Sequence, residues 1–373
     1  MLDQQTIDLL MRGVNNVTWQ SLVMICVGLV LFYLAIVKDY EPLLLLPIGA
    51  GCILANLPLS PMIEEHGMLK ILYDMGVGNE MFPLLVFVGI GALTDFGPLL
   101  ESPKFVLLGA AGQFGIFLTL ILALLLGFTQ NEAASIGIIG AIDGPTSIYV
   151  SGILAPHMLG PITVAAYSYM SLVPVIMPPV IYAMTTKQER LIRMPYSSRT
   201  ISRRTRIIFP ILVTVMVGTL VPFATPLIGM LMLGNLMKES GCVERLTKAS
   251  SNEIANTVTI FLGLAIGATM VGTDFLKPQT MFILVLGLLA FGLDCAAGVF
   301  FAKILNWCGA GINPIIGAAG ISAFPMAARV CQRVAQDDDF ENFLLMHAMG
   351  ANAAGQVASV VAGGVVLALM GAA

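Results

Sequence analysis

The stretch GIIGAIDGPTSIYVSG, residues 137–152, places an aspartate in an apolar segment at a point where a regular helix cannot continue. Asp143 is followed by Gly144 and Pro145, and a proline lacks the backbone N–H that a helix interior requires. The stretch NPIIGAAGISAFPMAAR, residues 313–329, has the same character in the other half of the chain. In many membrane transporters, interrupted helices meet near the midplane of the bilayer and form the ion site there. The two stretches therefore predict discontinuous transmembrane helices.

The composition of the whole chain agrees with a membrane protein. Of the 373 residues, 57% are hydrophobic and only 11% are charged, whereas a soluble domain carries about 25% charged residues. Apolar runs of about 15 to 25 residues recur between short polar breaks, and this is the length that crosses a bilayer. We therefore predict an all-α, polytopic integral membrane protein with about 11 transmembrane segments. Soluble enzymes and nucleic-acid-binding proteins are excluded.

Four short sequence matches relate the two halves of the chain at nearly one spacing. A shift of 179 positions superposes Pro47 on Pro226, Asn56-Leu57 on Asn235-Leu236 and Thr94-Asp95-Phe96 on Thr273-Asp274-Phe275, and a shift of 177 superposes residues 138–141 on 315–318. We interpret the chain as a duplication, in which residues 1–40 form an extra N-terminal span, 41–184 the first membrane repeat, 185–206 a basic linker and 207–373 the second repeat. Each repeat holds about five apolar segments, and an odd number of crossings inverts the second copy.

The charges are concentrated in the loops. Seven of the 18 basic residues fall within twenty positions, opposed only by Glu189: Lys187, Arg190, Arg193, Arg199, Arg203, Arg204 and Arg206. Because loops rich in lysine and arginine stay in the cytoplasm, we place the linker there, and we expect the N-terminus on the same side. The acidic run at residues 337–339 indicates a solvated loop.

Asp143 is the leading candidate for a functional residue, because an acid at the centre of a bilayer costs at least about 2.5 kcal/mol. Carboxylate, amide and hydroxyl oxygens suit a hard cation, so we group Asp143 with Asn313, Ser322 and Asn352 as candidate metal ligands. Asn352 lies four residues before Gln356, hence on the same helix face. A helix cap at Asp143 and simple helix packing at Asn352 are the structural alternatives.

Two further charged residues, Asp294 and Arg329, lie in or beside apolar segments. Asp294 lies inside an apolar run and is a candidate for an ion path. Arg329 lies near the end of its span beside Arg333, so anchoring of a helix end is the alternative to a functional role. The three histidines have no metal-ligand spacing, so we expect no zinc or redox metal.

Several long motifs resemble those of one family. GAIDGPTSI (residues 140–148), YSYM (167–170), NPIIGAAGISAFPMAAR (313–329) and GANAAGQ (350–356) are similar to signature regions of the beta subunits of sodium-pumping, biotin-dependent decarboxylases. That family serves oxaloacetate, methylmalonyl-CoA, glutaconyl-CoA and malonate. The resemblance extends over essentially the whole chain, with Ile142 standing where the family has a small residue.

The resemblance implies a function that no single chain performs alone. A beta subunit decarboxylates carboxybiotin presented by a partner, exports sodium and consumes one proton from the outer side. The implied partners are a carboxyltransferase alpha subunit, a biotin carrier subunit and a small membrane-anchor subunit in the bacterial cytoplasmic membrane, and a homo-oligomer is compatible with this picture. Sodium and the partner's biotin are the implied cofactors, since this chain has no biotin-acceptor motif.

The resemblance also assigns site residues: Asp143, Tyr169, Asn313, Gly317, Ser322 and Arg329 match functional positions of the family. Arg329 suits a clamp on the carboxylate of carboxybiotin, while Ser322 and Tyr169 suit a proton relay. Gly317 lets the backbone approach the cofactor closely. Composition and periodicity alone leave open an alternative, a sodium-coupled secondary transporter of a small carboxylate.

Overall fold

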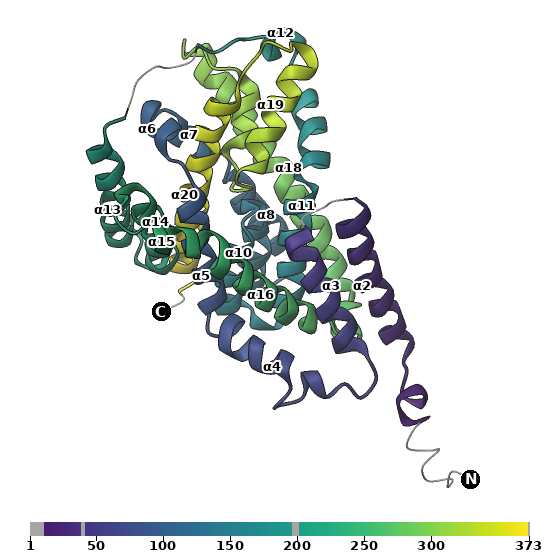
Figure 1. The fold of residues 1–373 in the computed structure, drawn as a ribbon. Helices are drawn as coiled ribbons and strands as arrows, with labels where there is room; N and C mark the ends of the chain where they lie inside the picture. Colours follow the sequence, from purple (N-terminus) through teal and green to yellow (C-terminus); the bar gives the residue numbers. More distant parts are fainter. Residues whose placement is uncertain (1–10, 39–41, 196–200, 372–373) are drawn as a thin grey trace.

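The computed structural model describes residues 11–38, 42–195 and 201–371, and the regular secondary structure in these ranges is helical (Figure 1). The prediction of an all-α chain is therefore confirmed. The first ten residues, on which the orientation of the N-terminus depends, lie outside the described residues, as does Arg199 of the basic linker.

Four helices are long and apolar enough to cross a membrane: Trp19–Val37, Phe105–Leu125, Pro278–Trp307 and Leu345–Leu369. Two bent pairs meet the same test, Pro42–Asn56 with Pro61–Val77 (109°) and Pro156–Met170 with Leu172–Met184 (66°). The prediction of a polytopic membrane protein is confirmed, and the number of 11 segments stays a prediction.

The described helices lie in two groups, one before and one after the linker. The first half contains α2 (Trp19–Val37), α3 (Pro42–Asn56), α4 (Met68–Leu72), α5 (Met81–Leu93), α6 (Gly97–Glu101), α7 (Phe105–Ala111), α8 (Phe114–Leu125), α9 (Gln130–Gly137), α10 (Gly144–Leu154) and α11 (Leu159–Met184). The linker carries α12 (Lys187–Arg190). The second half contains α13 (Arg203–Leu220), α14 (Thr225–Ser240), α15 (Glu244–Ala249), α16 (Ala255–Thr269), α17 (Gly272–Phe275), α18 (Pro278–Trp307), α19 (Met326–Asp338) and α20 (Leu345–Leu369).

Both predicted helix breaks are present. A short 3₁₀ turn, η3 (Ile138–Ala141), separates α9 from α10, and the next residue, Ile142, has a positive φ of 52° that a helix does not allow. A second turn, η7 (Pro314–Gly320), begins at the cap residue Asn313 and precedes α19. Irregular backbone inside a membrane protein must find hydrogen bonds within the protein, so these breaks have to lie against other segments.

The two halves contact each other reciprocally. The Nδ2 of Asn56, at the end of α3, donates to the carbonyl of Met270 (2.7 Å) just after α16. The Nδ2 of Asn235, in α14, donates to the carbonyl of Thr94 (3.0 Å) just after α5. Asn56 and Asn235 are the pair that the shift of 179 superposes, so each half closes a helix end of the other. The duplication and its inverted sense stay predictions.

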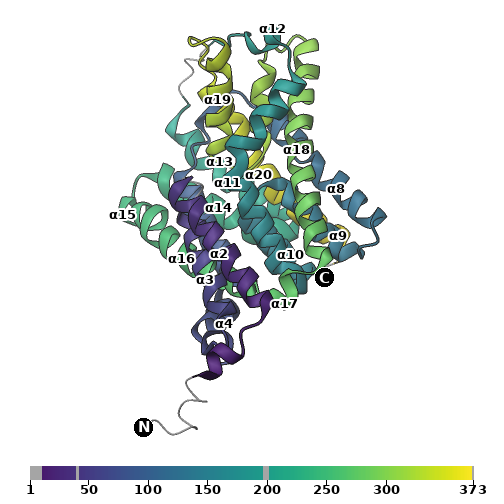
Figure 2. The same cartoon turned by 90° about the vertical axis from the view of Figure 1, so that its right-hand side faces the viewer.

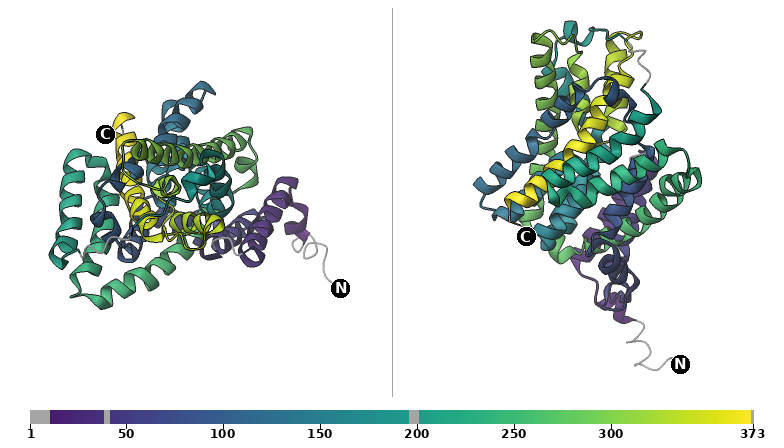
Figure 3. Two further views of the ribbon diagram at one scale, coloured as in Figure 1. Left: turned by 90° about the horizontal axis from the view of Figure 1, so that it is seen from above. Right: turned by 90° about the vertical axis from the view of Figure 1, so that its left-hand side faces the viewer.

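Each half also has an outer pair of helices that pack on each other. The pair α2–α3 packs at one flank of the molecule and the pair α13–α14 at the opposite flank (Figures 1 and 3). Helix α2, in the segment that we treat as an extra span, packs on α3 as α13 packs on α14. The boundaries of the repeats stay predictions.

The acidic run at the end of α19 binds the basic linker, contrary to our expectation of a solvated loop. Arg190 pairs with Asp338 (2.5 Å) and Arg193 with Asp339 (2.7 Å). Hydrogen bonding by Arg193 lowers the pKa of Asp339, so this ion pair persists until the pH falls into the acid range. These ion pairs join α12 and the linker to the end of α19, at the end of the molecule where α12 lies in Figure 2. Such pairs cannot be read from a single sequence.

We predict that α14 and α5 pack too closely at Gly234 to leave room for a methyl group. A Cβ atom there would overlap the carbonyl oxygen of Val88, whereas nothing lies within 4 Å of a Cβ at Gly229 of the same helix. Gly234→Ala should lower the melting temperature of the detergent-solubilised protein. The matched control Gly229→Ala should leave it unchanged or raise it, since alanine is favoured over glycine in a helix by about 1 kcal/mol. Equal melting temperatures for both variants would contradict the close packing.

Candidate functional site

The carboxylate of Asp143 is 3% exposed and caps the first turn of α10. Its Oδ1 accepts the backbone N–H of Thr146 (3.4 Å), and its Oδ2 accepts the Thr146 hydroxyl (2.8 Å). Asp143 therefore does cap a helix, as the structural alternative predicted. Its carboxylate also has contacts outside this helix.

Helix α20 supplies two more donors to the same oxygen. The Nε2 of Gln356 lies 3.1 Å and the Oγ of Ser359 lies 3.0 Å from Asp143 Oδ2. Neither residue was among our candidate ligands. A signal was present, because positions 352, 356 and 359 are spaced by four and three residues and share one helix face. Asp143 is thus enclosed by neutral donors from two halves of the chain.

Ser322 and Asn352 join the two broken stretches beside this carboxylate. The backbone N–H of Ser322 donates to the carbonyl of Ala141 (3.2 Å), and its hydroxyl donates to the carbonyl of Gly355 (3.2 Å). The Nδ2 of Asn352 donates to the carbonyl of Ile321 (2.6 Å). Its Oδ1 is buried and accepts no hydrogen bond from any residue that the structure describes. The segments that carry Asp143, Ser322 and Asn352 therefore meet.

The side chains gathered here fit a monovalent hard cation. They offer carboxylate, hydroxyl and amide oxygens from Asp143, Thr146, Ser359, Gln356 and Asn352, and hard cations prefer oxygen ligands. Within the described ranges, no group of three histidine, cysteine or acidic side chains could hold a metal ion. The unpartnered Oδ1 of Asn352 is free to serve as a ligand.

The two neighbouring tyrosines have different surroundings. The hydroxyl of Tyr169 donates to the carbonyl of Leu284 in α18, so it is not bonded to Ser322. The ring of Tyr167 lies against Gly144, where a Cβ would come within 3 Å of it, and its hydroxyl has no partner in the described part of the chain. Tyr167, which we did not select, thus contacts the residue that follows Asp143.

Asn313 and Gly317 lie on the linker side of the second break. The Nδ2 of Asn313 donates to the carbonyls of Arg190 (2.9 Å) and Ile192 (2.7 Å), and its Oδ1 accepts the N–H of Ile315 (3.0 Å). The structure records no hydrogen bond between Asn313 and Asp143. A Cβ at Gly317 would overlap the carbonyl oxygen of Gly298, so this glycine lets η7 pack against α18.

Arg329 lies in the first turn of α19 and is exposed. No ion pair involving its guanidinium is found in residues 11–38, 42–195 and 201–371. An unpaired guanidinium that water can reach is suited to binding an incoming carboxylate in two parallel hydrogen bonds. Asp338 lies nine residues later in the same helix and pairs with the linker. At about 1.5 Å per residue, Arg329 is therefore about 14 Å along α19 from the linker.

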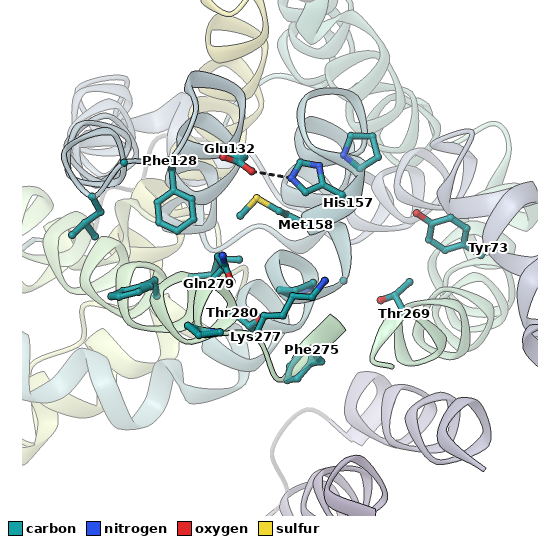
Figure 4. A pocket seen from close by; sticks show the side chains of 18 residues that line it. Tyr73, Phe128, Glu132, His157, Met158, Thr269, Phe275, Lys277, Gln279 and Thr280 are labelled. Atoms are coloured by element: carbon teal, nitrogen blue, oxygen red, sulfur yellow. Dashed lines mark hydrogen bonds and ion pairs between the residues drawn. The ribbon is translucent and has the colours of Figure 1, made fainter. Parts of the chain in front are cut away.

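A cavity of about 730 Å³ lies at the start of α18 (Figure 4). Lys277 and Thr280, at the start of α18, line it together with Glu132 and His157, which are 2.9 Å apart. The other end of α18 lies beside the linker, since Lys303 pairs with Glu189 (3.1 Å). Hydrogen bonds from the Thr129 N–H and from His157 lower the pKa of Glu132, which keeps it ionised in this cavity.

Comparison with known proteins identifies the family. A family profile described as the Na⁺-transporting oxaloacetate decarboxylase beta subunit matches residues 20–370. The chain belongs to this family of beta subunits. The match covers the broken stretches and α20, so the cluster around Asp143 lies within the part that defines the family.

Three relatives show how broad the family is. The chain is 52% identical to the glutaconyl-CoA decarboxylase subunit beta of Acidaminococcus fermentans, over 95% of this chain and 94% of the relative. It is 50% identical to the methylmalonyl-CoA decarboxylase subunit beta of Propionigenium modestum, over 96% and 97%. It is 47% identical to the oxaloacetate decarboxylase beta chain 2 of Salmonella typhimurium, over 92% and 94%. The family resemblance that we read from the motifs is confirmed.

We predict that Ser359 contributes to cation affinity through Asp143. Ser359→Ala removes a hydroxyl 3.0 Å from the carboxylate, and loss of one hydrogen bond to a charged group costs about 1.5 to 3 kcal/mol. The sodium concentration for half-maximal sodium-dependent activity should therefore rise roughly tenfold or more. Ser151→Ala is the matched control, because Ser151 is buried in α10 but donates to the carbonyl of Ser147. A similar rise in both variants would exclude a specific role for Ser359.

Proposed function

We propose that this beta subunit decarboxylates carboxybiotin carried by a partner subunit and couples that reaction to sodium export, with one proton consumed. The observation that carries the proposal is the Asp143 carboxylate, buried between two broken helices and enclosed by neutral oxygen-bearing side chains. The matched relatives are decarboxylase beta subunits, which favours this function over a sodium-coupled carrier of a carboxylate.

We place the linker end in the cytoplasm of a bacterium, at its inner membrane. The start of α2 and α12 lie at opposite ends of the molecule (Figures 1 and 2), so a cytoplasmic linker conflicts with our expectation of a cytoplasmic N-terminus. We retain the cytoplasmic linker, because its prediction rests on seven cations. The start of α2 and the cavity of Figure 4 then face the outer side.

Carboxybiotin would arrive from the linker end, where Arg329 is exposed. The guanidinium of Arg329 binds the carboxylate and holds the ring in place. Cleavage of the bond between the ureido nitrogen and the carboxyl carbon releases carbon dioxide, and the nitrogen takes up one proton. Ser322, whose N–H and hydroxyl bond Ala141 and Gly355, links this region to Asp143. Gly317 and Asn313 shape the same end, and Tyr169 supplies a second hydroxyl for proton transfer.

Coupling follows if sodium and a proton compete for Asp143. A sodium ion bound by the ionised carboxylate draws on the oxygens of Thr146, Ser359 and Asn352. Protonation removes the charge that retains the ion, and sodium is then released toward the outer side. Sodium is thus the cargo, while biotin on a partner supplies the carboxyl group.

The partners that we propose are a carboxyltransferase alpha subunit, a biotin carrier subunit and a small membrane-anchor subunit. The chain is similar at 47% to 52% identity to relatives named for three different substrates. We infer that the alpha subunit chooses the acid, since the residues around Asp143 contact no organic substrate in this scheme.

We predict that Asp143→Asn abolishes sodium transport. The amide keeps the cap on α10 but cannot carry the charge that holds the cation. In vesicles containing the complete complex, radioactive sodium uptake and carboxybiotin decarboxylation should both fall by roughly 100-fold or more. Retention of both activities would remove Asp143 from the site.

We predict that Arg329 acts through its planar guanidinium. Arg329→Lys should lose most decarboxylation of free carboxybiotin, and Arg329→Ala should lose more, because a lysine ammonium cannot make two parallel bonds. Arg333→Ala removes another exposed cation one turn later and should be nearly silent. If Arg329→Ala retains full activity, carboxybiotin binds elsewhere.

A further inference from the structure

A second acid lies at the middle of the longest helix. Asp294 is the seventeenth residue of the 30-residue helix α18 and is fully buried. At about 1.5 Å per residue, it lies about 24 Å from Pro278, near the middle of a helix long enough to cross a membrane. Nothing in the proposed function uses this carboxyl group.

The two oxygens of Asp294 have unequal surroundings. Its Oδ1 accepts the backbone N–H of Gly115, at the start of α8. Its Oδ2 receives no hydrogen bond from any described residue. Glycines face both oxygens, since a Cβ at Gly115 would lie 2.7 Å from Oδ1 and a Cβ at Gly140 would lie 2.7 Å from Oδ2. Helices α8 and α18 and the turn η3 are thus shaped around this group.

An ionised carboxylate at this depth needs a counter-charge or a proton. The atoms that crowd Gly115 and Gly140 beside Asp294 come from Ala290 and Ile116, and only one of them, the backbone carbonyl of Ala290, is an oxygen. A sodium ion requires several oxygen ligands, so this site is poor for sodium. A proton needs no such shell, and it removes the charge whose burial is costly.

Few titratable groups face Asp294. Helices α7 and α8 and the turns η3 and η7 carry none, and α9 carries only Glu132 at its outer end. Helix α11 carries Tyr167, Tyr169 and Tyr182, of which Tyr169 bonds α18 at Leu284, ten residues before Asp294. Cys295 is its neighbour along α18. No cation among the described residues of these elements is placed to neutralise Asp294.

We infer that Asp294 is a second proton-binding carboxyl group of the pump, separate from the sodium site. One proton bonds to Oδ2 when the acid forms, and the same proton leaves when the carboxylate returns. Because Oδ2 abuts Gly140, three residues before Asp143, the change of charge acts on the turn that positions the sodium ligand. The link to transport rests on the proposed function, whereas proton binding at Asp294 does not.

A purely structural role is the competing explanation, since Asp294 caps α8 through Gly115. Asparagine can make the same cap but cannot titrate, so Asp294→Asn separates the two roles. Asp95→Asn is the matched control, because Asp95 Oδ1 also accepts the N–H of a glycine, Gly97 (2.8 Å), but its side chain is 43% exposed.

The test measures the infrared carboxylic-acid band of the full chain, labelled with ¹³C at its aspartates, at a pH well above the ordinary aspartate pKa of about 3.9. Asp294→Asn should lose a band that added sodium does not change, and Asp95→Asn should keep it. In the complete complex, Asp294→Asn should lower sodium-dependent turnover by roughly 100-fold and alter its pH profile, while radioactive sodium binding at equilibrium is retained.

Three outcomes would overturn the inference: an unchanged band, wild-type turnover with a wild-type pH profile, or loss of sodium binding in Asp294→Asn. An unchanged band or wild-type turnover would leave Asp294 only the role of a helix cap. Loss of sodium binding would make it a sodium ligand. If Asp294→Asn does not fold, the sodium-insensitive band must persist in Asp143→Asn, and its absence there is equally decisive. Failure of sodium transport in the wild-type complex would defeat the proposed function without changing the infrared result.

Discussion

Burial of the Asp143 carboxylate inside a membrane protein is the constraint on which the rest of the structure depends. A charge at this depth is tolerated only where the protein surrounds it with polar groups. The chain meets this requirement by interrupting two helices and by bringing Gln356 and Ser359 of α20 to the same oxygen. Because interrupted helices leave backbone groups unpaired, the two breaks also bond each other, through the N–H of Ser322 and the carbonyl of Ala141.

Small residues make this arrangement possible. A Cβ at Gly355 of α20 would overlap the carbonyl of Gly320, and a Cβ at Gly112 would overlap the same carbonyl. The second break therefore packs between α20 and the α7–α8 junction with no room for a side chain at these glycines, as is typical of closely packed membrane helices. The arrangement places oxygen atoms with precision, and it leaves little tolerance for added volume.

Much of the fold could be predicted from local chemistry. Proline, glycine and an isolated acid mark both breaks, and apolar length marks the spans. The contacts that complete the site could not be predicted, because they join distant segments. Gln356 reaches Asp143 across 213 positions, Asn313 bonds the linker backbone, and the ring of Tyr167 lies against Gly144. Likewise, the sequence predicts that the acidic run at residues 337–339 is solvated, whereas the fold places Asp338 against Arg190.

The reciprocal contacts between the two halves also bear on how the protein is made. Asn56 donates to the carbonyl of Met270, which follows it by 214 residues. At a synthesis rate of about 5 to 20 residues per second, α3 waits roughly 10 to 40 seconds for α16 to emerge from the ribosome. Throughout that interval the amide of Asn56 has only its local bond to the Cys52 carbonyl (2.9 Å), so the nascent first half depends on the insertion machinery, or on provisional contacts, to shield the rest of the side chain.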